Sequence, residues 1–145
     1  MDSNTIILGR NTAIVMCERK RPKHSGDILY IPLLFDKYDL KQYLRMRLKR
    51  ILKSEFLKLK KNSNFYLVGE IDFELTKKFR DKKILSMLKD STIYVREDAI
   101  KLTRIEIREI LVHELAHIFS KHHDEKFQMA VRYIGGSQRR LPLQI

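Results

Sequence analysis

The histidines of this chain are concentrated in one short segment. Four of its five histidines lie between positions 113 and 123, in the sequence HELAHIFSKHH. His113 and His117 are four residues apart. On an α-helix they would lie on one face, about 6 Å apart along the axis. Two imidazoles at that spacing can both reach one ion at about 2.0–2.1 Å, the usual zinc–nitrogen distance. The segment therefore predicts a metal-binding helix.

The residues around this histidine pair supply the other parts of a catalytic metal site. Glu114 follows the first histidine, where a carboxylate can hold the attacking water and take its proton. A catalytic zinc typically has three protein ligands and one open position. His123, six residues after His117, is the predicted third ligand, and the adjacent His122 is the alternative. We expect Asp124 to cap a helix or to orient a ligand.

Local signals predict a helix on each side of the turn that carries His123. Thr103, followed three residues later by Glu106, forms a capping box at a helix start. This helix is predicted to run to about Ser120–Lys121. A last helix is predicted from Glu125 to Ile134, ended by Gly135-Gly136. The first helix presents apolar residues at helical spacing, which are Ile107, Leu111, Leu115 and Ile118. In the last helix, the predicted apolar side consists of Phe127, Val131 and Ile134.

Length and composition bound the class of protein. At 145 residues, the chain is predicted to form one domain. No apolar run approaches the roughly 20 residues that span a bilayer, and the N-terminus does not resemble a signal peptide. A single cysteine, Cys17, excludes an intramolecular disulfide framework and is predicted to be a small apolar residue in a strand. We therefore expect a monomeric cytoplasmic or nuclear protein that is not secreted.

The chain is strongly basic. Its 30 Lys and Arg residues against 18 Asp and Glu give a net charge of +12, which suggests a polyanionic partner such as nucleic acid. Residues 37–61 are predicted to form a long amphipathic helix with the apolar stripe Leu40, Leu44, Leu48, Ile51, Leu52, Phe56 and Leu59. The residues expected to contact phosphates are Arg45, Arg47, Lys49, Arg50, Lys53, Lys60 and Lys61. The alternative is a solvated back face of a core helix.

The remaining segments predict short strands and one further helix. Alternation and β-branched content indicate strands at Thr12–Cys17, Ile28–Phe35, Phe65–Leu75 and Ser91–Arg96. Pro32 would make the second of these an edge strand or an irregular segment. Between the first two strands, residues 18–27 are expected to form an exposed loop with His24 on the surface. A helix is predicted from Thr76 to about Leu88, with Ile84, Leu85 and Leu88 facing inward.

The histidine segment resembles the active-site motif of a known protease family. HELAHIFSKHHDEKF is similar to the WLM-type metalloproteases, which have HELxH, then a His-Asp pair, then a Phe three residues after the Asp. The same histidine spacing resembles the bacterial YgjP-type metallopeptidases, and the chain is more loosely similar to the SprT/Spartan proteases. The specific match covers His113 to Phe127. The glycine that many zincins have between the second and third ligands is absent; Phe119, Ser120 and Lys121 occupy that interval.

This resemblance implies a fold, a cofactor and an activity. The implied fold is α+β, a minimal zincin-like metalloprotease domain in which a small antiparallel or mixed sheet packs on the active-site helix and the long basic helix. The implied enzyme is a Zn²⁺-dependent peptidase that cleaves proteins bound or crosslinked to DNA, with single- or double-stranded DNA bringing it to its substrate. His113, His117 and His123 would hold the zinc. Glu114 would act as general base and then protonate the leaving amine.

Two other functions and two details of the site stay open at the level of sequence. The chain could be a metallo-endonuclease acting on RNA, since bacterial rRNA-maturation nucleases have similar histidine spacing but lack the glutamate. It could instead be a nucleic-acid-binding module with a structural zinc, closed by His122 as a fourth ligand. The strand Thr92–Arg96 is expected to offer its edge to an extended substrate. No oxyanion-stabilising group can be assigned from the sequence, and Tyr133 is named only as a guess.

Overall fold

The computed structural model describes residues 3–62 and 69–135, and in this part the chain is α+β. The first sheet has the order β1-β2-β4-β3, from β1 (Ser3–Ile7), β2 (Arg10–Cys17), β3 (Lys23–Ser25) and β4 (Ile28–Pro32). The second has the order β5-β7-β6, from β5 (Asp72–Thr76), β6 (Ser86–Lys89) and β7 (Thr92–Arg96). The helices are α1 (Lys37–Asn62), the 3-10 helix η1 (Glu97–Lys101), α2 (Arg104–Ala116) and α3 (Glu125–Ile134).

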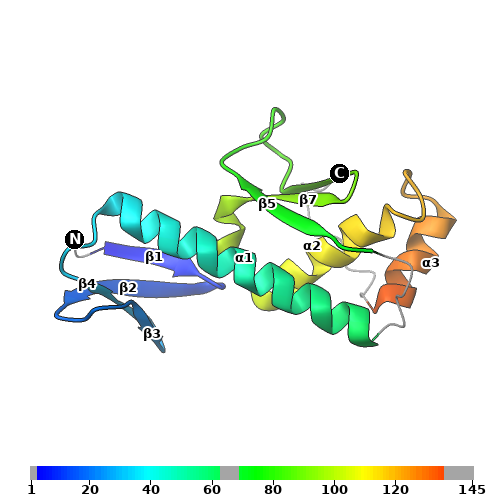
Figure 1. Ribbon diagram of the computed structural model, residues 1–145. Helices are drawn as coiled ribbons and strands as arrows, with labels where there is room; N and C mark the ends of the chain where they lie inside the picture. Colours follow the sequence, from blue (N-terminus) through cyan, green and yellow to red (C-terminus); the bar gives the residue numbers. More distant parts are fainter. Residues whose placement is uncertain (1–2, 63–68, 136–145) are drawn as a thin grey trace.

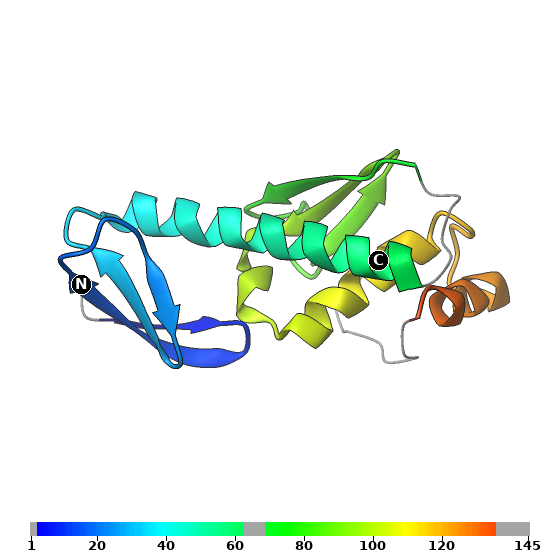
Figure 2. The ribbon, with the colours of Figure 1, turned by 60° about the horizontal axis from the view of Figure 1, so that its bottom comes forward.

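The long helix α1 connects the two sheets. The first sheet lies beside the N-terminal half of α1, and α1 runs from there to α3 at the opposite end of the molecule (Figure 1). The second sheet and α2 lie against its C-terminal half, which Figure 2 shows from a second direction. One cluster of buried side chains links all these elements, from Ile7 through Leu52 and Leu111 to Phe127. Among the described residues, none of the helices combines the length and the apolar character of a membrane-spanning segment.

The helix α1 follows its sequence pattern closely. It was predicted over residues 37–61 and spans Lys37–Asn62. The inner part of its apolar stripe is buried, namely Leu48, Ile51, Leu52, Phe56 and Leu59. Leu40 and Leu44, nearer its start, are partly buried against the same core. The amphipathic period was therefore a sufficient guide to this element.

Both sheets are mixed, because β2 pairs with β4 and β5 pairs with β7 in parallel. The expectation that Pro32 confines its strand to an edge is wrong, since β4 lies between β2 and β3. Proline fits because it is the last residue of β4, and the pairing of β4 with β3 stops at Tyr30. Beyond that point one side of β4 has no ladder partner, so the missing N–H of Pro32 interrupts no hydrogen bond to β3.

Residues 76–88 do not form the predicted helix. Thr76 ends β5, and Ser86–Lys89 form β6, which makes an antiparallel hairpin with β7. Asp90 in the hairpin turn has φ +55°, a left-handed conformation that Asp adopts more readily than most residues. Three apolar residues were too few to distinguish a helix from a short strand.

Three other expectations need adjustment. The segment 18–27 contains the short strand β3, so it is not a loop throughout. His24 within it is partly buried, and its Nδ1 lies 2.8 Å from Nη1 of Arg47. The predicted strand Phe65–Leu75 lies partly outside the described residues, and its described part begins the strand at Asp72. The strand predicted at Ser91–Arg96 is confirmed as β7.

One buried carboxylate joins α1 to the start of α2. Glu55 is fully buried within the apolar stripe of α1. Its two oxygens accept hydrogen bonds from Nη1 of Arg104 at 3.0 Å and from Nε of Arg108 at 2.9 Å. Burial alone would raise the pKa of Glu55, but the hydrogen bonds and charges of Arg108, Lys58 and Arg104 outweigh burial and lower it. These hydrogen bonds therefore hold α2, the helix that carries His113, against α1.

We expect Glu55→Gln to lower the free energy of unfolding by about 1.5–3 kcal/mol at neutral pH, as for hydrogen bonds between charged groups. The folded-state pKa is lowered, so the carboxylate stabilises the fold above its unfolded-state pKa, and this contribution disappears as pH falls through the folded-state pKa. Urea unfolding of the wild type and of Glu55→Gln, at neutral pH and at steps below pH 4.5, measures the difference in their free energies of unfolding. Glu70→Gln, at an exposed acid, is the control. A difference in free energy of unfolding that stays constant as the pH falls would contradict the stabilising role of the Glu55 carboxylate.

Candidate metal centre

The helix α2 carries the first two histidines. It begins at the predicted capping box: Thr103 Oγ1 accepts from the N–H of Glu106 at 3.2 Å, and Thr103 N–H donates to the Glu106 carboxylate at 3.1 Å. Ile107, Leu111 and Leu115 are fully buried, so this side of α2 faces the core. His113 and His117 lie beside that buried stripe and are half-buried.

The helix is shorter than predicted. It ends at Ala116, with His117 as its C-cap, rather than near Ser120–Lys121. The next amides bond three residues back: Ile118 N–H to Leu115 O at 3.1 Å and Phe119 N–H to Ala116 O at 3.0 Å. Such tightening is common in the last turn of a helix. Because the helix has ended, Ile118 is 43% exposed instead of joining the core.

The turn after α2 returns the chain to the site without a glycine. No residue from 117 to 124 has a positive φ, so the conformation that favours glycine does not occur there. Ser120 Oγ lies within hydrogen-bond distance of His122 O, at 3.1 Å, and Asp124 Oδ1, at 2.9 Å. The same Asp124 oxygen accepts from the N–H of Phe127 at 3.0 Å and caps α3. Asp124 is thus confirmed as a helix cap, and its bonds fix the segment that carries His123.

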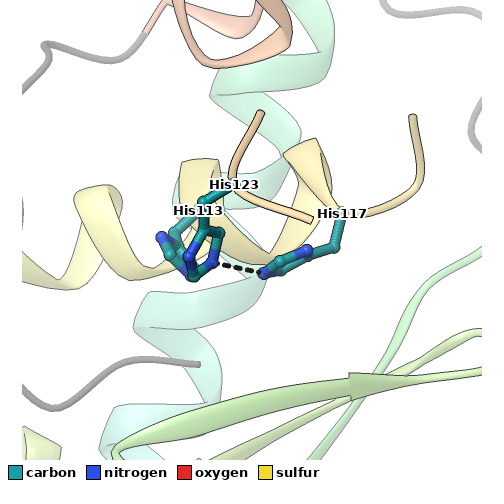
Figure 3. A group of neighbouring side chains, drawn as sticks. All are labelled: His113, His117 and His123. Carbon is teal, nitrogen blue, oxygen red and sulfur yellow. Dashed lines mark hydrogen bonds between the residues drawn. The ribbon is translucent and has the colours of Figure 1, made fainter. Parts of the chain in front are cut away.

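Three histidine rings meet at the end of α2. The ring centroids of His113, His117 and His123 are 5.0 Å apart in each pairing, and one nitrogen from each lies within 4.8 Å of the others. Figure 3 shows the rings around a common space, with a dashed line between His117 and His123. Their Nε2 atoms are 3.2 Å apart. Two nitrogens bound tetrahedrally to one zinc would lie about 3.3 Å apart, so the donor set suits such an ion.

Neighbouring groups orient these rings. Nδ1 of His117 lies 3.1 Å from the carbonyl oxygen of Ser120, where an N–H at Nδ1 would leave the lone pair on Nε2. The ring of Phe127 is buried and lies 4.8–5.0 Å from each of the three imidazoles. His122 is exposed and does not belong to the group of close nitrogens. The structure therefore brings His123, and not His122, to the other two histidines.

Glu114 is buried beside the histidines and held by the second sheet. It is 1% exposed. Ser86 Oγ donates to Oε2 at 2.5 Å, and the N–H of Leu88 donates to Oε1 at 3.1 Å. Burial raises the pKa of Glu114 to about 7, against the hydrogen bonds from Ser86 and Leu88 and the charge of His117. Ser86 and Leu88 were not predicted as site residues, because their segment was predicted to be helical.

A hollow of about 520 Å³ opens next to Glu114. Its lining consists of Met87, Leu88, Asp90, Glu114, His117, Ile118 and Lys121. The prediction that Thr92–Arg96 offers a free edge is wrong, because β7 is the central strand and pairs with both neighbours. The strand at the edge beside α2 is β6. Tyr133 does not reach this hollow; it lines a separate one with Phe119, Lys126, Met129 and Ala130.

The basic residues of α1 have different environments. Arg45 and Lys41 both form ion pairs with Glu97. The charge of Arg45 is therefore already balanced within the fold. Another hollow, of about 330 Å³, lies between α1 and the start of α2 and contains no acidic residue in its lining. The residues that line it are Tyr43, Arg47, Arg50, Ile51, Ser54 and Arg104. The other predicted contacts are exposed or half-buried on α1, namely Lys49, Lys53, Lys60 and Lys61.

Cys17 ends β2 in the first sheet, which Figure 1 shows away from the end of α2. Among the described residues, the group of side chains that could hold a metal consists of His113, His117 and His123.

Comparison with protein-family models, with curated proteins and with solved structures finds no match to the chain. The function is therefore inferred from the geometry of this site.

Proposed function

We propose that the protein is a zinc-dependent metallopeptidase with a zincin-like catalytic domain. The observation that carries the proposal is the triangle of imidazoles from His113, His117 and His123, with the buried carboxylate of Glu114 next to the first ligand on the same helix. Three protein ligands leave one position for water or substrate, which distinguishes a catalytic zinc from a closed structural one. An adjacent carboxylate supports hydrolysis over metal storage.

Each residue has a defined role in this proposal. His113, His117 and His123 would hold the zinc, which would supply a Lewis acid for the peptide carbonyl and for the attacking water. Glu114 accepts the proton of that water and returns it to the leaving amine. Phe127 packs against all three imidazoles and restricts their rotation. Ser120 accepts a hydrogen bond from His117 through its carbonyl group and favours coordination through Nε2.

The edge of β6 supports an extended polypeptide as substrate. Peptides commonly bind by adding a strand to an exposed sheet edge. The hollow beside β6 has a size typical of binding pockets and includes apolar side chains from Met87, Leu88 and Ile118. Glu114 and His117 lie in the same lining, so a chain bound there would pass the catalytic group.

The test is hydrolysis of fluorescein-labelled casein by the purified protein. We expect about one zinc ion per chain by elemental analysis, since the site has a single set of ligands. Treatment with a chelator should remove both the ion and the activity, and added zinc should restore both. Casein hydrolysis that persists without the metal would reject the proposal, as would a zinc-loaded protein that cleaves no protein substrate, free or on DNA.

We further propose that the substrate proteins are bound or crosslinked to DNA. The hollow between α1 and α2 offers guanidinium groups from Arg47 and Arg50 and hydroxyls from Tyr43 and Ser54, with no carboxylate in its lining. Arg104 also lines it, but its guanidinium is already hydrogen-bonded to the buried Glu55. Arginine forks and hydroxyls are suited to phosphate oxygens. The hollow adjoins the first residue of α2, whereas His117 caps its other end. The 13 residues of α2 separate them by about 20 Å. DNA held there would leave space for a protein at the metal site.

We expect the double variant Arg50→Gln/Lys53→Gln to weaken DNA binding and to reduce the slope of log affinity against log salt by about two. Both side chains are exposed on α1, and each would lose one phosphate contact. Fluorescence anisotropy with a labelled duplex and a labelled single strand, at several salt concentrations, measures the slope. The control is Lys77→Gln/Lys78→Gln, which removes the same charge from an exposed segment after β5. Equal slopes for the two variants would show that only net charge matters.

The RNA endonuclease and structural-zinc alternatives give different results in the same assays. A nuclease would cut labelled RNA in a metal-dependent manner and leave casein intact. A structural zinc would be needed for folding, so its removal would abolish the thermal unfolding transition as well as nucleic-acid binding. The three-histidine donor set and the neighbouring Glu114 favour the peptidase over both.

A further inference from the structure

Both oxygens of the Glu114 carboxylate are bound to the edge strand β6. Oε2 accepts from the hydroxyl of Ser86, and Oε1 accepts from the backbone N–H of Leu88. Ser86 and Glu114 are both fully buried, so water does not compete for the first of these bonds. A zinc peptidase needs this carboxylate to face the attacking water. The two bonds therefore decide how the general base is presented.

The register of the hairpin shows which backbone groups of β6 are directed away from β7. In an antiparallel pair, successive residues alternate between bonding the partner strand and facing outward. Leu85 O accepts from the N–H of Arg96 on the side of β7, whereas the N–H of Leu88 donates away from it, to α2. By this alternation, the N–H and C=O groups of Ser86 and Leu88 face away from β7. Ser86 is fully buried, whereas Leu88 is only partly buried. Leu88 N–H is thus a group that an added strand would use.

Glu114 and a bound polypeptide therefore compete for one donor. Leu88 lines the same hollow as Glu114 and His117. A polypeptide that extends β6 would direct a carbonyl oxygen to the N–H of Leu88. One N–H cannot make a full hydrogen bond to both acceptors. The bond from Ser86 is different, since it comes from a buried side chain and not from the strand edge.

We propose that Ser86 is the positioning residue for the general base, and that the substrate main chain takes the Leu88 N–H from Glu114. The inference rests on the proposed peptidase function. In the free protein, Ser86 and Leu88 hold both carboxylate oxygens. When an extended substrate pairs with β6, its carbonyl group accepts from Leu88, and Oε1 is released to accept the proton of the attacking water. Ser86 keeps Oε2 in place, so the carboxylate stays at the site.

The first experiment compares Ser86→Ala and Ser86→Thr in casein hydrolysis. Groups that orient the ligands of a metal site typically contribute 10- to 100-fold, and we take the same range for Ser86. We expect Ser86→Ala to lower kcat by about that factor, with KM and zinc content close to wild type. Its melting temperature should also fall, because Glu114 Oε2 loses its donor in a buried position. Ser86→Thr retains the hydroxyl and should recover most of kcat. Unchanged kcat in Ser86→Ala would overturn the positioning role, as would a Ser86→Thr variant that keeps zinc and the melting temperature but does not recover kcat.

The second experiment measures binding without catalysis. Glu114→Gln and Glu114→Ala have the same charge, but Gln keeps an oxygen that can accept from Leu88 and Ala does not. Anisotropy of labelled casein should show several-fold tighter binding to Glu114→Ala. Equal affinities would overturn the exchange at Leu88. This result does not require turnover, so it decides the inference even if the wild type cleaves nothing. An active wild type with equal affinities would reject the exchange alone, leaving the peptidase function intact.

Discussion

Glu114→Gln is expected to abolish casein hydrolysis while the zinc content and the fold stay unchanged. General acid–base groups contribute about 10²–10⁴-fold to rate, and a glutamine cannot accept the proton of the attacking water. Glutamine matches glutamate in shape, and its oxygen can still accept from the N–H of Leu88. Its amide can also donate to Ser86 Oγ, reversing the bond seen in the wild type. The buried position therefore remains hydrogen-bonded, which avoids the cost of an unpaired polar group.

The measurement combines kcat, elemental analysis for zinc and thermal unfolding on the same preparations. The control is Glu125→Gln, which makes the same change of charge at an exposed position in the first turn of α3. We expect the control to retain wild-type kcat. Hydrolysis that survives in Glu114→Gln, with zinc bound and the fold intact, would exclude Glu114 as the general base. Loss of zinc in that variant would instead assign the carboxylate a part in holding the ion.

The elements that could be predicted from the sequence are those specified by neighbouring residues. The capping box of Thr103 and Glu106 and the cap made by Asp124 depend on contacts across three residues. The helix α1 depends on a period repeated over seven turns. The approach of His113 to His117 follows from helical geometry alone. His123 could be predicted only because its spacing matched a known motif, since the turn before it has no helical or strand pattern.

The parts of the site that could not be predicted depend on contacts distant in sequence. Ser86 is 28 residues from Glu114, and nothing in its neighbours indicates that it faces a catalytic group. The strand β6 is only four residues long, so its apolar residues fit a helix equally well. The burial of Glu55 also depends on arginines about 50 residues away. Which strand lies at an edge depends on the order of the strands in the sheet. The strand β7 was predicted to offer a free edge, but it is the central strand of the second sheet.

The adjacent histidines offer a test of the metal site that needs no knowledge of the substrate. We expect His123→Ala to lose most of the zinc and all hydrolysis, because two histidines alone hold the ion weakly compared with three. His122→Ala should keep about one zinc per chain and near wild-type kcat. His122 is exposed, and its described bond is an acceptance by its backbone carbonyl from Ser120, which alanine preserves.

This pair is well matched, because both side chains are exposed imidazoles in the same turn, one residue apart. Any general effect of removing an imidazole from this turn should appear in both variants. Zinc titration with a competing chelator gives the affinities, and thermal unfolding with and without zinc shows whether the ion stabilises each variant. Equal loss of zinc in both would indicate four histidine ligands and a closed structural site. Loss in His122→Ala alone would exclude His123 as the third ligand, although its Nε2 lies 3.2 Å from that of His117.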